Sequence, residues 1–216
     1  VSMSLIEELK KVLGDQNVLT GTDKERYSSD WLGQYRFEPL CVVRPASTEE
    51  VSKVVRLAGS FQVNIVPVGG NTGLNGGTHS DDAISISMER MNKICEIRLN
   101  SKIAIVEAGV ILSNLHQLVN ENDLMFPLTF GARGSATIGG VLSTNAGGSN
   151  VLKYGNTRDL VLGVEIVLPN GEIMNLMSEL HKDNSGYCLR DLVIGAEGTL
   201  GIITKAVVKL FPKPKA

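Results

Sequence analysis

The sequence is poor in aromatic residues and carries no excess of positive charge. Phenylalanine, tryptophan and tyrosine together make up 5% of the 216 residues, with a single tryptophan. Lysine and arginine number 21 against 23 acidic residues, which gives a formal net charge of -2. A protein that binds nucleic acid through phosphate contacts normally carries a basic face. DNA and RNA are therefore not predicted as partners.

Paired cysteines and long apolar runs are also missing. The three cysteines, Cys41, Cys95 and Cys188, lie far apart with no C-x-x-C spacing, so neither a disulfide framework nor a zinc site is indicated. No run approaches the roughly 20 apolar residues of a membrane span. The N-terminal residues mix acids with bases, unlike a secretory signal or transit peptide. We therefore expect a reducing, cytoplasmic location without a membrane span.

Metal-binding and hydrolase patterns are absent as well. His79, His116 and His181 are separated by more than any usual metal-ligand spacing, and each is interpreted as a surface or satisfied core histidine. Ser135 and Ser143 do not lie in a G-x-S-x-G turn, so a serine hydrolase has no support. No metal is predicted.

A strand, a helix and a second strand are predicted between residues 40 and 68. Residues 40–43 form a short apolar run that ends before a proline. Ser47 with Glu50 makes a capping box that opens a helix, and residues 63–68 return as a strand. Such a βαβ unit has parallel strands. Residues 83–88 are predicted as a third strand of the same lobe.

The later part of the chain indicates antiparallel hairpins. Apolar runs flank the turn-like pair Asn100-Ser101, and a second pair of runs flanks Asn170-Gly171, a strong hairpin signal. Residues 201–210 are predicted as a last strand. The fold class is therefore α+β (α/β) with two lobes. A small parallel α/β lobe covers residues 1–93, and an antiparallel sheet with flanking helices covers residues 94–216.

Two more helices are predicted from serines at their starts. Ser4 and Glu7 form a capping box ahead of an apolar stripe that stops at Gly14. Ser113 is predicted to cap a helix that carries Leu115 and Leu118 on one side.

Glycine, by contrast, is abundant and clustered. The 23 glycines concentrate in residues 69–77, 131–148 and 195–201. Glycine lets a ligand approach the backbone, and successive N–H groups can bind anionic oxygens without a charged side chain. Neither G-x-x-x-x-G-K-[ST] nor G-x-G-x-x-G occurs in the first cluster, which follows a predicted parallel strand. The pattern favours a pyrophosphate site of another geometry, although tight turns alone are the alternative for any single cluster.

Three stretches resemble a known family of flavin-binding domains. They are PVGGNTGLNGGT, the run from PLTFGARGSATIGG to LPNGEI, and DLVIGAEGTLGIIT. Together they resemble the FAD-binding (PCMH-type) domain of the vanillyl-alcohol oxidase superfamily. The resemblance is nearest to the branch of D-lactate, glycolate and D-2-hydroxyglutarate dehydrogenases, which are FAD-linked oxidases. It covers about residues 20 to 212. It implies two lobes with FAD between them.

The resemblance also implies which residues hold FAD. The first stretch would wrap the two phosphates, the second would follow the ribityl chain and the flavin, and the third would lie near the adenosine end. In that order the implied residues are Pro67, Gly69, Gly70, Asn71, Thr72 and Gly73; Gly134, Ser135, Thr137, Gly139, Gly140, Asn145 and Gly148; and Glu197, Gly198 and Ile202. A side chain at position 70 is expected to occupy the place of the phosphate.

Two departures from the family pattern carry expectations of their own. Many members attach FAD covalently through a histidine in the first loop, where this sequence has Asn71, so noncovalent FAD is expected. Family enzymes continue into a substrate or cap domain, which is expected to be absent here. The catalytic base is expected in that domain, so none is named, and a chain without it is expected to bind FAD without turnover and to oligomerise to some extent.

The activity implied is oxidation of a D-2-hydroxy acid of the D-lactate, glycolate or D-2-hydroxyglutarate type to the 2-keto acid. A quinone, a cytochrome or an electron-transfer flavoprotein would accept the electrons. Two alternatives stay open at this point. One is the FAD domain of another oxidoreductase of the superfamily, such as an alcohol or sugar oxidase or an enolpyruvyl-sugar reductase. The other is a non-catalytic FAD-binding subunit.

Overall fold

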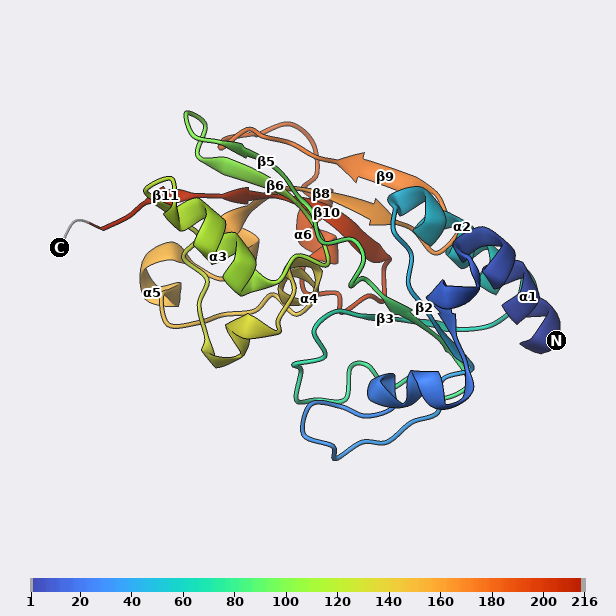
Figure 1. The fold of residues 1–216 in the computed structure, drawn as a ribbon. Helices are drawn as coiled ribbons and strands as arrows, with labels where there is room; N and C mark the ends of the chain where they lie inside the picture. The colour runs from blue at the N-terminus through green and yellow to red at the C-terminus, as the bar shows by residue number, and fades with distance from the viewer. Residues whose placement is uncertain (1, 215–216) are drawn as a thin grey trace.

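The computed structural model describes residues 2–214, and its main features are two sheets that lie side by side (Figure 1). The first has the strand order β1-β2-β4-β3 and the second the order β5-β6-β10-β8-β9. A small pair, β11 with β7, lies at the end of the molecule opposite to α1 (Figure 1). The mixed fold class predicted from the sequence is confirmed.

The first sheet is mostly parallel. Strands β2, β4 and β3 run parallel, and β1 joins β2 in the antiparallel sense. The predicted strand, helix and strand are present, and the predicted third strand, β4, lies between β2 and β3. All four residues of β4 are buried, which suits a central strand covered on both faces. The bounds are β1 Val18–Leu19, β2 Cys41–Val43, β3 Ile65–Val68 and β4 Ile84–Ser87.

Two helices cover this sheet. Helix α2, Thr48–Phe61, begins as predicted: Ser47 Oγ accepts the backbone N–H of Glu50. The Glu50 carboxylate accepts from the N–H of Ala46, one residue before the cap. Helix α1, Ser2–Leu13, begins two residues before Ser4, so the predicted cap at Ser4 is wrong. A 3-10 helix over Gly21–Tyr27 follows.

The second sheet is antiparallel throughout, and both predicted hairpins are present. Gly171 has φ +82° in the second turn, a conformation that favours glycine there. Strand β10 is central and pairs with β6 and β8. The bounds are β5 Ile94–Arg98, β6 Ile103–Glu107, β8 Val161–Val167, β9 Ile173–Leu176 and β10 Ile202–Lys209.

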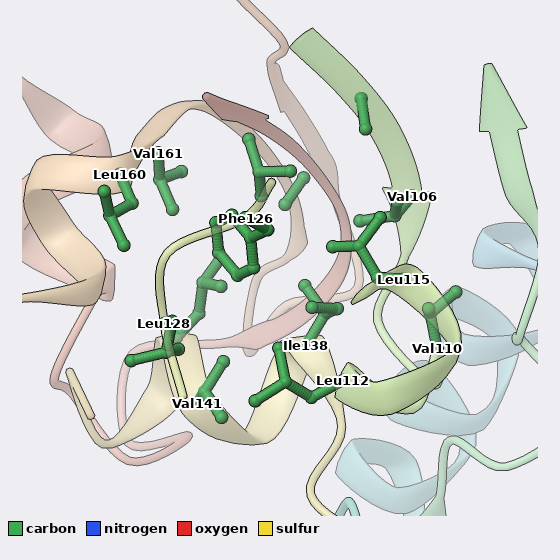
Figure 2. Close-up of a cluster of buried hydrophobic side chains, with 14 of the residues drawn as sticks. Val106, Val110, Leu112, Leu115, Phe126, Leu128, Ile138, Val141, Leu160 and Val161 are labelled. Carbon is green, nitrogen blue, oxygen red and sulfur yellow. The ribbon is translucent and has the colours of Figure 1, made fainter. Parts of the chain in front are cut away.

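Helices α3 and α4 pack on one face of this sheet around a core of aliphatic side chains (Figure 2). Leu112, Leu115 and Ile138 are fully buried there, and each contributes roughly 1.5 to 3 kcal/mol by leaving water. The remaining bounds are α3 Leu112–Asn120, β7 Leu124–Met125, α4 Ile138–Ser143, α5 Val151–Tyr154, α6 Leu189–Val193 and β11 Phe211–Pro212, with 3-10 helices at Asp15–Asn17, Gly131–Gly134 and Thr157–Leu160.

The start of α3 corrects a prediction. The helix begins at Leu112, so Ser113 lies inside it and does not cap it, and the preceding Ile111 makes no side-chain cap. Instead the N–H of Leu112 donates to the carbonyl oxygen of Ala136 at 2.9 Å. A distant segment therefore supplies the partner that a local cap normally provides.

The two sheets share a core. The cluster built on α1, α2 and the first sheet also contains Ala108, Val167 and Ile202 from the second part of the chain. Polar contacts reinforce this: Thr48 Oγ1 on α2 donates to Glu165 Oε1 on β8 at 2.5 Å. Neither sheet is therefore packed independently of the other, and the division at residue 93 stays a prediction.

None of the helices within residues 2–214 is long and apolar enough to cross a lipid bilayer.

Cys41 is fully buried on β2, and burial raises the pKa of its thiol to about 11. Cys95 and Cys188 are exposed, and all three thiols are free.

Candidate cofactor site

A cavity of about 690 Å³ lies where the ends of β3 and β4 meet the start of β10. This volume is in the range of sites that hold small molecules and cofactors. Three segments supply most of its lining: residues 67–78 after β3, residues 136–147 around α4, and residues 197–203 before β10. These are the three glycine-rich stretches of the sequence, and the fold brings them to one place.

The loop of residues 69–78 presents free backbone donors. None of the ten N–H groups in this loop donates a hydrogen bond to another residue of the described range 2–214. Donors that lack a protein partner bind water or a ligand. Successive free amides in a glycine-rich loop suit the oxygens of a phosphate.

At two glycines of this loop, the segment of residues 135–137 behind it leaves no room for a side chain. A Cβ at Gly70 would lie 1.9 Å from the carbonyl oxygen of Ser135, and one at Gly69 would lie 2.3 Å from Thr137 Oγ1. The expectation that a side chain at position 70 would occupy the phosphate position is therefore wrong. Such a side chain would push the loop away from the segment of residues 135–137.

Twelve of the sixteen residues predicted to hold FAD line this cavity. They are Pro67, Gly69, Gly70, Asn71, Thr72, Gly73, Thr137, Gly139, Gly140, Glu197, Gly198 and Ile202. The fold thus gathers residues that are up to 135 positions apart, from Pro67 to Ile202, around one hollow. The contact of each with FAD stays a prediction.

Four predicted residues do not line the cavity. The Ser135 carbonyl faces Gly70, as described above. Asn145 has a left-handed φ of +47°, and its Oδ1 accepts the backbone N–H of Arg158. At Gly148 a Cβ would lie 2.2 Å from the carbonyl oxygen of Thr129. Gly134 faces open space. Asn145 and Gly148 shape the backbone next to the cavity.

Sequence reasoning missed other parts of the wall. Met88 follows β4, Ala108 follows β6, and Phe130 precedes the second glycine cluster; all three line the cavity. The signal for Met88 was its place at the carboxyl end of a parallel strand, where ligands commonly bind. Ala108 carries no comparable signal, because its position depends on how the second sheet meets the first. The remaining lining residues include Leu74, Asn75, Thr78, Ser143, Thr144, Ala146 and Gly147.

The cavity has little charge. Among its lining residues in the described range, Glu197 is the only one with an acidic side chain, and none is a lysine, an arginine or a histidine. An anionic ligand would therefore be held by amide dipoles, not by cations. Val68, Met88 and Ile203 offer an apolar wall that suits a flat ring system. This combination of free amides, apolar wall and volume fits FAD.

The histidines lie elsewhere. His116 Nε2 donates to the Leu128 carbonyl at 2.8 Å, and burial lowers the pKa of its ring. His79 is exposed beside Asp81, and His181 contacts the carbonyl of Ser101. In residues 2–214 no three His, Cys, Asp or Glu side chains gather as a metal site.

A family model described as an FAD-binding domain matches residues 39–177. The chain is 42% identical over 193 residues to the D-2-hydroxyglutarate dehydrogenase of Xanthomonas citri pv. viticola, covering 89% of this chain and 41% of that protein. It is 39% identical over 211 residues to the D-2-hydroxyglutarate–pyruvate transhydrogenase of Saccharomyces cerevisiae, covering 96% and 42%. With the mitochondrial D-2-hydroxyglutarate dehydrogenase of Arabidopsis thaliana it shares 40% over 212 residues, covering 96% and 38%.

A solved structure of alkyldihydroxyacetonephosphate synthase superposes with a TM-score of 0.88 at 26% identity. The alignment covers 99% of this chain and 41% of that one. The chain thus spans about two fifths of the length of these relatives.

Proposed function

The chain belongs to the FAD-binding domain family, and on that premise we propose that it is the FAD-binding part of a dehydrogenase that oxidises a D-2-hydroxy acid to the 2-keto acid. The observation that carries the proposal is the loop of free amides at residues 69–78, set in a cavity of suitable size. The relatives are named for D-2-hydroxyglutarate, which supports this acid as the substrate in preference to D-lactate or glycolate.

Each glycine-rich stretch has a proposed task. The amides of residues 69–78 would bind the pyrophosphate of FAD through dipoles, with no cation required. Gly139, Gly140 and the wall around Ile203 would take the ribityl chain and the flavin, and the apolar wall would exclude water from it. The Glu197 carboxylate can only accept hydrogen bonds, so it suits a sugar hydroxyl near the adenosine end. FAD, when bound, supplies the acceptor for the hydride of the hydroxy acid.

We assign no catalytic base in this chain. Glu197 is the one acidic or basic side chain that lines the cavity within the described residues, and it is proposed to hold the cofactor. The groups that bind the substrate and accept its hydroxyl proton belong, in this proposal, to the part of the relatives that this chain does not span. The electron acceptor, a quinone, a cytochrome or an electron-transfer flavoprotein, would meet the whole enzyme. A reducing compartment, and a tendency of the chain to oligomerise, remain part of the proposal.

We predict that the FAD is held without a covalent bond. The purified chain, after addition of FAD and gel filtration, is expected to show a flavin absorption spectrum. Acid or heat denaturation is then expected to release all of the flavin into the supernatant, because Asn71 has no nucleophilic nitrogen to form a link. Yellow colour that stays in the protein pellet would contradict the noncovalent attachment. If the chain of 216 residues never retains FAD, the proposal that it binds FAD by itself is contradicted.

The substrate proposal requires the full-length gene product. With an artificial electron acceptor, D-2-hydroxyglutarate is expected to reduce the enzyme at the highest kcat/KM, with D-lactate and glycolate poorer and the L-enantiomers inactive. The chain of 216 residues, loaded with FAD, serves as the control and is expected to show no turnover. Oxidation of polyols, or reduction by NADPH, would instead support another branch of the superfamily. Turnover by no substrate, with FAD bound, would favour a non-catalytic FAD-binding subunit.

A further inference from the structure

Both polar atoms of the Asn71 side chain form hydrogen bonds within the protein. Its Nδ2 donates to the carbonyl oxygen of Ser29 at 2.7 Å, and its Oδ1 accepts from Thr78 Oγ1, also at 2.7 Å. The assignment of the two amide atoms is unambiguous, because a backbone carbonyl can only accept. The backbone of Asn71 has φ +52°, a left-handed conformation that asparagine tolerates better than most residues. Asn71 thus joins its own loop, through Thr78, to the segment that contains Ser29.

The partner segment, residues 28–37, has a defined shape of its own. Ser29 and Arg36 form an isolated antiparallel bridge, and the buried Asp30 carboxylate accepts from the N–H groups of Leu32 and Tyr35. The ring of Tyr35, in the same segment, lies close to Gly76 of the glycine loop: a Cβ at Gly76 would be 3.4 Å from Tyr35 Cε2. The glycine loop therefore touches this segment at Asn71 and again at Gly76.

In this loop the backbone N–H groups are free to bind a ligand, and the side chains of Asn71 and Thr78 hold the backbone in place. Glycine-rich backbone is flexible, and ordering it opposes ligand binding unless it is already ordered. The side chains of Asn71 and Thr78, seven positions apart in the sequence, form a hydrogen bond that connects the two ends of the loop. For comparison, Asn64 is exposed just before β3, does not line the cavity and makes no side-chain hydrogen bond in residues 2–214.

We propose that Asn71 is a positioning residue for the cofactor: its amide ties the glycine loop to residues 28–37 and to Thr78, and so holds the backbone N–H groups ready for a pyrophosphate. Because both polar atoms of the side chain bond to protein, the role proposed for it needs no direct contact with the cofactor. This inference rests on the proposed function for the identity of the ligand, but the tie between Asn71 and Ser29 stands independently of it. It also gives asparagine at this position a structural purpose of its own, apart from the lack of a covalent link.

The first test compares Asn71 with an asparagine that does not line the cavity. FAD dissociation constants are measured for the wild-type chain, Asn71→Ala and Asn64→Ala by quenching of flavin fluorescence. Loss of two neutral hydrogen bonds that order the loop is expected to weaken FAD binding by roughly ten- to thirtyfold in Asn71→Ala. Asn64→Ala is expected to stay within about twofold of wild type. Equal effects of the two substitutions would overturn the proposal.

A double-mutant cycle tests whether Asn71 acts through Thr78. Thr78→Val removes the hydroxyl with little change in volume and is expected to weaken FAD binding by roughly three- to tenfold, and Thr78→Ser is expected to restore it. In the Asn71→Ala background Thr78→Val should add little, because the bond is already lost. Fully additive effects would mean that each side chain contacts the cofactor separately, which would overturn the positioning role.

The single tryptophan provides a readout that does not depend on FAD. Trp31 is half exposed and lies two residues after Ser29, so the segment that Asn71 holds contains the chain's own fluorophore. In the FAD-free chain, Asn71→Ala is expected to shift the Trp31 emission to the red, with Asn64→Ala unchanged. An unchanged spectrum in Asn71→Ala would overturn the tie to residues 28–37. Should the wild-type chain not bind FAD, the proposed function fails, while this shift still decides the tie.

Discussion

Gly70→Ala is expected to abolish FAD binding, with a loss of affinity of at least about a hundredfold, while the far-ultraviolet circular dichroism stays unchanged. The added methyl carbon would lie 1.9 Å from the carbonyl oxygen of Ser135 and 2.7 Å from its carbon. Both are backbone atoms, so no rotamer change relieves the contact, and the loop must move away from residues 135–136. That movement separates the free amides of the loop from the rest of the cavity. Equilibrium dialysis against FAD measures the loss.

The control is Gly131→Ala, in the second glycine cluster but outside the cavity lining. A Cβ at Gly131 has no heavy atom within 4 Å, so the protein accepts it without adjustment. Gly131→Ala is expected to bind FAD within about threefold of wild type. An FAD affinity of Gly70→Ala equal to that of wild type would refute the assignment of this loop as the cofactor site.

Glu165→Ala is expected to lower the free energy of unfolding by about 2 to 4 kcal/mol. The substitution leaves the buried Thr48 hydroxyl without its acceptor, and it leaves Thr204 Oγ1 with only the longer bond, of 3.3 Å, to the Glu165 carbonyl. Glu165 Oε1 accepts from Thr48 Oγ1 on α2 and from Thr204 Oγ1 on β10, and both threonines are buried. The carboxylate therefore joins a helix of the first sheet to two strands of the second. Urea titration followed by circular dichroism measures the change.

Two further variants make this result specific. Glu165→Gln keeps one acceptor oxygen and is expected to recover most of the stability, to within about 1 kcal/mol of wild type. Glu172→Ala removes an exposed glutamate from the turn between β8 and β9 and is expected to change the free energy of unfolding by less than about 0.5 kcal/mol. The inter-sheet role of Glu165 is refuted if Glu165→Ala and Glu172→Ala unfold at the same urea concentration.

Elements whose signals are local were predicted correctly from the sequence. The cap at Ser47, the hairpin turn at Asn170-Gly171 and the change from parallel to antiparallel strands depend on neighbouring residues, and the structure contains all three. The three glycine clusters also identified most of the cavity lining, because a backbone that other groups approach closely requires glycine, and clustered glycines are visible in the sequence.

Predictions failed where a distant segment replaced a local partner. Ser113 was predicted as a cap from local spacing, but the Ala136 carbonyl bonds to the first turn of α3 instead. Gly70 was expected to make room for a phosphate, yet its glycine is required by the Ser135 carbonyl. Both misassignments have the same cause: residues more than twenty positions away occupy the space in question.

The sequence by itself determined that this chain is a mixed α/β protein with clustered glycines, because propensity, capping and close backbone approach are encoded over short distances. The resemblance of three of its stretches to a known family indicated FAD binding, and the match of residues 39–177 to the FAD-binding domain family agrees with it. Only the tertiary structure decided that β4 lies at the centre of the first sheet and that Met88 and Ala108 complete the cavity. It alone placed the Asn71 amide between Ser29 and Thr78. These features depend on packing between segments far apart in the chain, which no local pattern specifies.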